Sequence, residues 1–364
     1  MDASVEIGTG HVMRCLTLAQ ELKNNNTEVI FICRDLQGNL AELIRKKGFN
    51  CALLSKPSGD IGCQKDGPKH EKWLGVSWKQ DANDSLHVIE NSSSGDWLVV
   101  DHYGLDARWH KEIRKKIKRV LVIDDLADRA LDCDLMLDQN FYLNSEVRYE
   151  NLISQDCSLL LGPRYAMLRD EFISQSDEVV NLDEMNIKRI LVFMGGADYT
   201  NETEKTILAL DGVTDIGFEV DVVVSSVNPL ADKIKELCSL RANYTYHKDI
   251  TYMSELMKRA DLAIGAGGAT VIERCYLGVP SLVTLVAENQ KETTLAYEEV
   301  GVLKCLGWYE YVTCLDISNA VVETLCNSKV LKSMRENSAK IVDIDSFLGV
   351  KFVASKMLNK YEKL

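Results

Sequence analysis

Short apolar runs and helical apolar repeats alternate along the 364-residue chain. In the first half, the runs Trp97–Val100 and Arg119–Ile123 are each followed by aspartate, and continuous runs of this kind are typical of strands buried on both faces of a parallel sheet. Further strands are predicted at 28–33, 51–54 and 134–137, with a helix at 39–47. The segment 55–72 is polar and rich in glycine, proline and lysine, which predicts a loop.

The second half repeats this alternation. Strands are predicted at 189–193, 219–224, 262–264 and 281–286, and a helix at 269–277. The pattern predicts an α/β fold with two facing, doubly wound Rossmann-like domains, residues 1–175 and 188–364, joined by an acidic linker at 174–188. Ligands of such sheets bind beyond the carboxyl ends of the strands, so we expect the site in a cleft between the domains.

A glycine-rich loop opens the chain. Gly8 and Gly10 permit a tight turn that leaves backbone amides uncovered to bind a phosphate of the substrate, and apolar residues at helical spacing predict a helix from His11 to about Leu22. A helix N-terminus favours an anion and disfavours a protonated ring, so a neutral His11 able to accept a proton is expected there. The alternative is a tight turn with a histidine that caps the helix.

A glycine loop in such a domain normally follows a strand. Only six residues precede Ile7, so we expect the N-terminal sheet to lack a member.

Three later segments carry candidate chemistry. In Gly265–Thr270, Gly267 and Gly268 predict a phosphate-binding loop, and Glu273 lies one turn into the next helix, where it could accept hydrogen bonds from ribose; a solvent-facing glutamate is the alternative. The pair Gly195 and Gly196 either supplies further backbone donors or forms a plain turn. After the strand at 97–100, Tyr103 could contact a substrate and His102 could be a second base, or both are core residues.

Composition excludes several classes of function. A net charge of −13 argues against nucleic acid or an anionic membrane as a partner. The eleven cysteines form no zinc motif and are typical of reduced thiols in a cytoplasmic protein. Aspartates between 124 and 138 do not match a calcium loop and are explained by turns, so no metal is expected. No nucleophile elbow or zinc-peptidase helix is present.

Taken together, motifs over roughly residues 2–300 resemble those of the UDP-2,4-diacetamido-2,4,6-trideoxy-β-L-altropyranose hydrolases, which remove UDP during bacterial pseudaminic acid synthesis. The motifs are Asp2-Ala3-Ser4 with Ile7 to Ala19, Asp101 to Leu105, Val122 to Arg129, Asp138-Gln139-Asn140, Gly162 to Arg169, Met194 to Asp198, and Gly265 to Glu273 with Glu288-Asn289-Gln290. The last glycine loop with its glutamate is also similar to that of GT-B glycosyltransferases.

The resemblance implies a GT-B-like fold, a UDP-sugar as the small-molecule substrate, and no metal or other cofactor. It implies that His11 activates water, that Glu273 holds the ribose of UDP, that Tyr103 and Arg169 contact the substrate, and that Asn289 lies near the diphosphate. A monomer is expected. A GT-B glycosyltransferase and an inactive UDP-sugar-binding protein are the alternatives.

Overall fold

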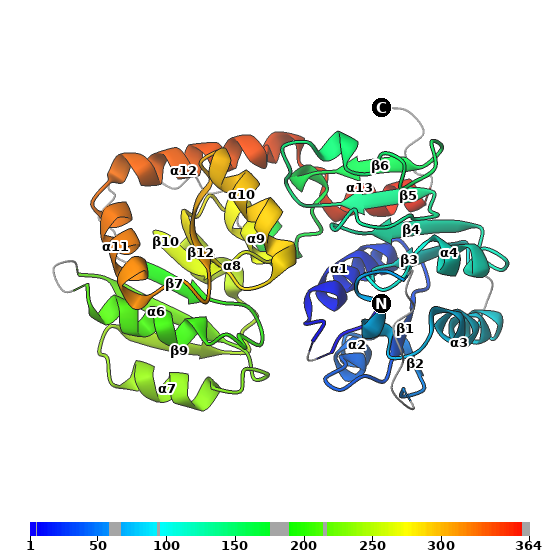
Figure 1. The fold of residues 1–364 in the computed structure, drawn as a ribbon, viewed down its shortest axis with the longest axis horizontal. Helices are drawn as coiled ribbons and strands as arrows, with labels where there is room; N and C mark the ends of the chain where they lie inside the picture. The colour runs from blue at the N-terminus through cyan, green and yellow to red at the C-terminus, as the bar shows by residue number, and fades with distance from the viewer. Residues whose placement is uncertain (5, 58–66, 93–94, 175–188, 214–216, 359–364) are drawn as a thin grey trace. The chain divides into compact units, whose positions relative to one another are not determined.

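The computed structural model describes residues 1–364 apart from 5, 58–66, 93–94, 175–188, 214–216 and 359–364. The chain divides into two compact units (Figure 1). Unit 1 comprises Met1–Asn140, Asn144–Met167 and the chain from Leu348 onward, and unit 2 comprises Phe141–Leu143 and Leu168–Phe347. The predicted linker lies almost wholly outside the described residues.

Unit 1 contains two parallel sheets. One pairs β1 with β2, and the other has the order β3-β4-β5-β6. The strands are β1 (Ile30–Arg34), β2 (Asn50–Leu54), β3 (Trp97–Val100), β4 (Arg119–Ile123), β5 (Leu135–Asp138) and β6 (Ser158–Leu161). The α-helices are α1 (Gly10–Asn24), α2 (Ala41–Lys46), α3 (Trp78–Glu90), α4 (Ala107–Ile113) and α13 (Gly349–Met357), with 3-10 turns η1 (Glu71–Leu74), η2 (Ser145–Val147) and η3 (Pro163–Tyr165).

The last helix, α13, lies in unit 1, so the C-terminal boundary differs from the predicted domain 188–364. The reason is an apolar face at Val350, Val353 and Ala354, which shares one buried cluster with Val12 of α1. The indole of Trp97 also donates a hydrogen bond to the backbone carbonyl of Met357 at 2.7 Å.

Unit 2 has one parallel six-stranded sheet in the order β12-β11-β10-β7-β8-β9. Its strands are β7 (Arg189–Phe193), β8 (Glu219–Val224), β9 (Tyr244–Lys248), β10 (Leu262–Ala266), β11 (Ser281–Leu285) and β12 (Leu303–Trp308). Its α-helices are α5 (Asp170–Ile173), α6 (Glu202–Asp211), α7 (Ala231–Ser239), α8 (Met253–Lys258), α9 (Thr270–Tyr276), α10 (Lys291–Glu299), α11 (Cys314–Leu325) and α12 (Ser328–Ile341), with 3-10 turns η4 (Glu288–Gln290) and η5 (Ile344–Ser346).

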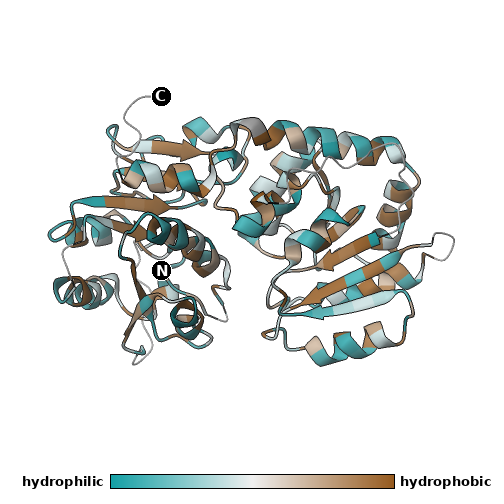
Figure 2. Ribbon diagram, turned by 180° about the vertical axis from the view of Figure 1, so that it is seen from behind, coloured by the Kyte–Doolittle hydropathy of each residue, from teal (hydrophilic) through white to brown (hydrophobic). Residues whose placement is uncertain are grey.

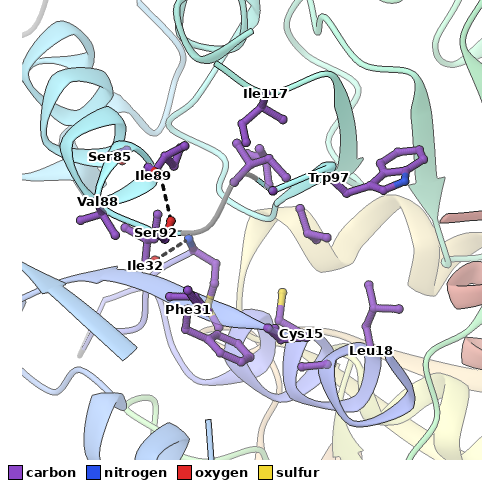
Figure 3. A pocket seen from close by; sticks show the side chains of 18 of the residues that line it. Cys15, Leu18, Phe31, Ile32, Ser85, Val88, Ile89, Ser92, Trp97 and Ile117 are labelled. Atoms are coloured by element: carbon purple, nitrogen blue, oxygen red, sulfur yellow. Dashed lines mark hydrogen bonds between the residues drawn. The ribbon is translucent and has the colours of Figure 1, made fainter. Parts of the chain in front are cut away.

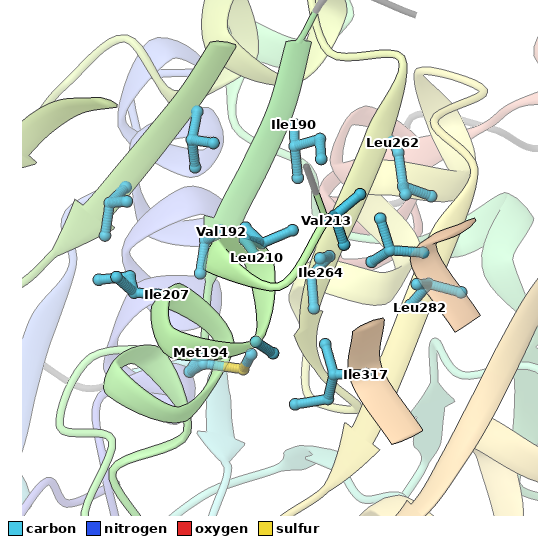
Figure 4. Packing of buried hydrophobic residues seen from close by; sticks show 14 of the residues in the cluster. Ile190, Val192, Met194, Ile207, Leu210, Val213, Leu262, Ile264, Leu282 and Ile317 are labelled. Atoms are coloured by element: carbon cyan, nitrogen blue, oxygen red, sulfur yellow. The ribbon is translucent and has the colours of Figure 1, made fainter. Parts of the chain in front are cut away.

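The core of unit 2 gathers the apolar residues of its central strands. Ile190 and Val192 of β7, Ile264 of β10 and Leu282 of β11 are fully buried against Ile207 of α6 (Figure 4). Central strands are hydrophobic in both units, whereas the covering helices carry polar faces (Figure 2). Among the described helices, none is both long and apolar enough to cross a membrane.

Close packing requires glycine at position 265, near the carboxyl end of β10. A Cβ atom there would lie 2.3 Å from Nη1 of Arg274 and 2.6 Å from the carbonyl oxygen of Phe193. Gly265→Ala is therefore expected to lower the free energy of unfolding by about 1–3 kcal/mol, measured by urea denaturation. Gly217→Ala is the matched control, since a Cβ there meets no atom within 4 Å, and equal effects of the two substitutions would contradict the packing argument.

Candidate functional site

In unit 1, three polar side chains follow three neighbouring strands. Asp101 follows β3, Asp125 lies just beyond β4, and Asn140 lies just beyond β5. Because β3, β4 and β5 are adjacent and parallel, these residues meet at the carboxyl edge of one sheet. This edge is where the fold places functional groups.

The start of α1 brings His11 to the same edge. Gly8 has φ +79°, a conformation that favours glycine, and the helix begins at Gly10. His11 is only 7% exposed, and its Nδ1 lies 2.5 Å from Oδ1 of Asp101. The prediction of a helix starting close to His11 is confirmed.

Arg14, one helical turn after His11, completes an ionic cluster. Its Nε and Nη2 donate to the two carboxylate oxygens of Asp101, each at 2.6 Å. Burial alone would raise the pKa of Asp101, but Arg14 and His11 hold that pKa well below its usual range. Asp101 is therefore a carboxylate, which can only accept hydrogen bonds.

Tyr103 lies against His11. The two ring centroids are 4.6 Å apart in an edge-on arrangement, and the Tyr103 hydroxyl donates to Asp125. Burial and the neighbouring Asp125 raise the pKa of the Tyr103 hydroxyl well above its ordinary value, so it remains a proton-bearing donor. The side-chain amide of Asn140 donates to the same carboxylate at 3.0 Å.

This geometry can support general base catalysis. An ionised Asp101 favours the tautomer of His11 that donates Nδ1–H to it, and this tautomer has its lone pair on Nε2. A base oriented in this way can accept a proton from water. In such a reaction Asp101 would act through His11, as a positioning residue.

His102 is a core histidine. It is 3% exposed, and its Nδ1 accepts a hydrogen bond from the backbone of Gly104 at 3.0 Å. Burial lowers the pKa of His102 to about 3, so it stays neutral at ordinary pH. The structure therefore favours the core reading over a second base.

Several aspartates of the 124–138 series are bound by protein groups. Arg129 pairs with Asp124, and Arg114 pairs with both Asp132 and Asp134. These carboxylates support loops and strand ends, as turn chemistry predicts.

In unit 2, the two glycine loops follow neighbouring strands. Gly195 and Gly196 follow β7, and Gly267 and Gly268 follow β10. The strand order reverses between β7 and β10, and such a switch point is where open α/β sheets bind ligands. The sequence prediction of two loops at strand ends is confirmed, whereas their binding role stays a prediction.

Glu273 and Arg169 lie together in unit 2. Nη2 of Arg169 is 3.3 Å from Oε1 of Glu273, and Arg169 also pairs with Glu171. The other oxygen, Oε2 of Glu273, is buried and has no hydrogen-bond partner among the described residues. Burial raises the pKa of the Glu273 carboxyl, although Arg169 opposes this. A buried acceptor without a donor is a candidate for binding a ligand hydroxyl.

The glycines of the second loop serve different purposes. A Cβ at Gly267 would lie 2.4 Å from Oγ1 of Thr294, so this glycine is needed for packing against α10. A Cβ at Gly268 would meet only Gln290, at 3.8 Å, which leaves room above the loop. Asn289 is exposed on η4, and the side chain of Gln290 accepts from the backbone of Val286 at 3.1 Å.

Some backbone amides that follow the first glycine loop of unit 2 already donate to a side chain of that loop. The carboxylate of Asp198 accepts from the backbone amides of Glu202 and Thr203, each at 2.9 Å, and so caps α6. An anion there would depend on the amides of Gly195 and Gly196. Gly195 has φ +92°, a conformation that favours glycine.

Four residues of the unit 1 site were given no role by the sequence prediction: Arg14, Asp101, Asp125 and Asn140. The sequence carries part of the evidence for these four residues. Residues 11 and 14 share one face of a helix, and the other three lie at or near strand ends. Their convergence depends on strand order, which the sequence does not state.

Known proteins are similar to this chain over most of its length. Residues 189–346 match the Glycosyltransferase family 28 C-terminal domain. An uncharacterized protein of Methanocaldococcus jannaschii is 28% identical over 80% of this chain, a match that spans only 56% of the archaeal protein. The spore coat polysaccharide biosynthesis protein SpsG of Bacillus subtilis is 24% identical, covering 85% of this chain and 83% of SpsG.

A third relative carries the name that the motifs indicate. The UDP-2,4-diacetamido-2,4,6-trideoxy-β-L-altropyranose hydrolase of Campylobacter jejuni is 24% identical, covering 80% of this chain and 92% of that enzyme. The sequence resemblance to these hydrolases is thereby confirmed.

Solved glycosyltransferases share the fold. MurG of Acinetobacter baumannii superposes with a TM-score of 0.64 at 15% identity, covering 97% of each chain. The calicheamicin glycosyltransferase CalG4 gives a TM-score of 0.60 at 14% identity, covering 98% of this chain and 97% of that chain. The chain therefore has the GT-B fold, matches the glycosyltransferase family 28 C-terminal domain over residues 189–346, and is similar to the UDP-2,4-diacetamido-2,4,6-trideoxy-β-L-altropyranose hydrolases.

Proposed function

We propose that this protein hydrolyses UDP-2,4-diacetamido-2,4,6-trideoxy-β-L-altropyranose to UDP and the free sugar, a step of pseudaminic acid biosynthesis. The observation that carries the proposal is the buried pair of His11, at the start of α1, and Asp101, in which the carboxylate can orient His11 as a base. The name of the Campylobacter jejuni relative supports the substrate.

The chemistry proposed for unit 1 is activation of water. Nε2 of His11 takes a proton from water as the water oxygen bonds to the anomeric carbon and the bond from that carbon to the diphosphate oxygen breaks. Attack opposite the leaving group would invert the anomeric carbon. A positioned base of this kind contributes about 10²–10⁴-fold to the rate. His11 then releases the proton to solvent, and Tyr103 is assigned a hydrogen bond to the sugar.

The chemistry proposed for unit 2 is nucleotide binding. Oε2 of Glu273 is assigned to the ribose hydroxyls, and the amides of the two glycine loops, with Asn289, to the diphosphate. Backbone donors of this kind stabilise the charge that develops on the leaving group, so we propose that the reaction needs no metal. Arg169 is assigned to the substrate beside Glu273, and the free thiols support a cytoplasmic location.

A glycosyltransferase is the second candidate, because the solved structures with this fold are glycosyltransferases. It would share the UDP site and pass the sugar to an acceptor rather than to water. A protein that binds the UDP-sugar without turnover is the third.

UDP release separates the three candidates. The purified protein is given the altropyranose substrate with EDTA and no acceptor, and the sugar is followed by NMR. Release of UDP with an equal amount of free sugar is the expected result. Binding of UDP without release would contradict hydrolysis, and release that requires an added acceptor would indicate a transferase.

Loss of the Glu273 carboxylate is expected to weaken UDP binding. Glu273→Ala removes the proposed acceptor of the ribose hydroxyls, so the Kd for UDP should rise by about 10-fold or more. Isothermal titration with UDP and with 2′,3′-dideoxy-UDP tests the assignment, because only UDP binding should respond. The exposed Glu236→Ala is the control. Equal weakening of both nucleotides would place Glu273 outside the ribose contact.

A further inference from the structure

Two cysteine thiols lie side by side in unit 1. Cys133 stands two residues before β5, and Cys157 stands directly before β6. Because β5 and β6 are adjacent parallel strands, both thiols lie at the amino edge of the sheet, opposite the edge that carries Asp125 and Asn140. The two Sγ atoms are 3.5 Å apart and share a hydrogen bond. A disulfide bond, with sulfur atoms about 2.0 Å apart, therefore requires them to approach by about 1.5 Å.

Strand pairing holds the two cysteines together. Leu135 and Ser158 are the first partners of the β5–β6 ladder. The amide of Ser158 also donates to the carbonyl of Asp134 at 2.9 Å, so the residues next to Cys133 and Cys157 are hydrogen-bonded to each other. The proximity of the two thiols is thus a property of the folded sheet.

The surroundings of the pair favour one thiolate. A hydrogen bond from Cys133 lowers the pKa of the Cys157 thiol, whereas burial and Asp134 raise it. The guanidinium of Arg114, which pairs with Asp134, lowers the same pKa. The hydrogen bond between the thiols and burial raise the pKa of Cys133. Cys157 is therefore the more easily ionised thiol, and the thiolate is the form that attacks an oxidant.

The two thiols also differ in exposure. Cys157 is half-buried, whereas Cys133 is only 4% exposed. A small oxidant in solution therefore reaches Cys157 more readily than Cys133. An accessible thiol of lowered pKa beside a second thiol is the arrangement typical of redox-sensitive cysteines.

Other thiols of unit 1 have different environments. Cys15 lies in the wall of a cavity with Leu18 and Phe31 (Figure 3), and burial raises the pKa of its thiol well above the ordinary value. Cys33 and Cys51 also form a hydrogen bond with each other. The register of β1 and β2 pairs Cys51 with Phe31, so Cys33 is offset from Cys51 by two residues. Strand spacing then sets their Cα atoms about 8 Å apart, which is beyond the usual range of a disulfide.

We propose that Cys133 and Cys157 are a redox modification site, at which a low-molecular-weight disulfide such as oxidised glutathione converts the two thiols into a reversible intramolecular disulfide. The Cys157 thiolate attacks one sulfur of oxidised glutathione, which forms a mixed disulfide and releases one glutathione thiolate. Cys133 then loses its proton to solvent and attacks Sγ of Cys157, which releases the second glutathione. The cysteines lose two electrons in total, and one oxidised glutathione is reduced to two glutathione molecules. The proposal does not depend on the catalytic assignment.

The disulfide would close the segment 133–157 at its base. This segment carries Asn140 and Arg148, which donate to the side chain and the backbone carbonyl of Asp125 at 3.0 and 2.9 Å. A cross-link between the ends of a segment removes conformational freedom from the unfolded chain. We therefore expect the oxidised protein to be more stable than the reduced one.

Oxidation of the purified, folded chain tests the proposal. The chain is incubated with oxidised glutathione, remaining thiols are blocked with iodoacetamide, and cross-linked peptides are mapped by mass spectrometry. The expected product joins Cys133 to Cys157, carries no glutathione on either residue, and reverts with dithiothreitol. Its Tm should exceed that of the reduced protein by roughly 5 °C.

Two variants separate the pair from other thiols. In Cys133→Ser, Cys157 should remain as a mixed disulfide with glutathione, and the rise in Tm on oxidation should be lost. The matched control is Cys326→Ser, at an exposed cysteine of unit 2. This control should form the linkage and gain the same stability as the wild type.

Four outcomes would overturn the proposal. Cys157 of the folded wild type could remain unmodified, or it could retain glutathione without a bond to Cys133. A linkage that forms only in urea would belong to the unfolded chain. Linkage of Cys33 to Cys51 in place of Cys133 to Cys157 would assign the redox chemistry to the β1–β2 pair.

Discussion

Replacement of His11 by asparagine or leucine is expected to reduce kcat for UDP release by about 10²–10⁴-fold, the contribution of a positioned general base. The residual rate should be independent of which of the two residues is introduced, because neither can accept the proton. The Kd for UDP should change by less than about threefold, since the proposed nucleotide contacts lie in unit 2. Turnover and isothermal titration measure the two quantities separately.

The matched control for His11 is His87→Asn, an exposed histidine on α3 in the same unit. It should leave both kcat and Kd unchanged. Normal turnover by either His11 variant would remove His11 from the reaction. A parallel loss of UDP affinity would instead assign His11 to binding.

Strands buried on both faces were predicted best from the sequence. The bounds of β4, β7 and β8 agree with the predicted ones, because a continuous apolar run is typical of a strand in the interior of a parallel sheet. The bounds of β3 agree as well, although it is a half-buried edge strand. The edge strands β6, β9 and β12 were not predicted. β9 reads Tyr-Thr-Tyr-His-Lys and is mostly half-exposed, so its sequence carries little of the hydrophobic signal that marks a strand.

Candidate site residues were found where the local sequence carries the chemistry, and their roles stay predictions. The glycine loops and His11 stand in short motifs, and the structure places Tyr103 against His11 and Arg169 against Glu273. Asp101 is different: it contacts His11 across 90 positions of sequence, and its position at a strand end fits a turn equally well. Which strand lies beside which is decided by tertiary packing, as is the return of α13 to α1.

Asp101→Asn is expected to reduce both turnover and stability. An asparagine NH₂ group in place of the carboxylate oxygen that faces His11 cannot accept a hydrogen bond from Nδ1–H. The same NH₂ group also points a donor at the Arg14 guanidinium, which is itself a donor. Loss of the correct tautomer should lower kcat by about 10²–10⁴-fold. Because the two residues act as one unit, the double variant His11→Asn/Asp101→Asn should lose no more kcat than His11→Asn alone.

The stability effect of Asp101→Asn has a defined pH dependence. Removing one partner of a buried ion pair leaves Arg14 uncompensated, which should lower the free energy of unfolding by about 3–5 kcal/mol at pH 7. The pKa of Asp101 is lower in the folded chain than its unfolded value of about 3.9, so its contribution is complete above that value and shrinks as pH falls below it. Urea midpoints at pH 7 and pH 3 should therefore differ less between wild type and variant at the lower pH. The exposed Asp156→Asn is the control, and a stability difference that grows on acidification would contradict an ionised Asp101 in the core.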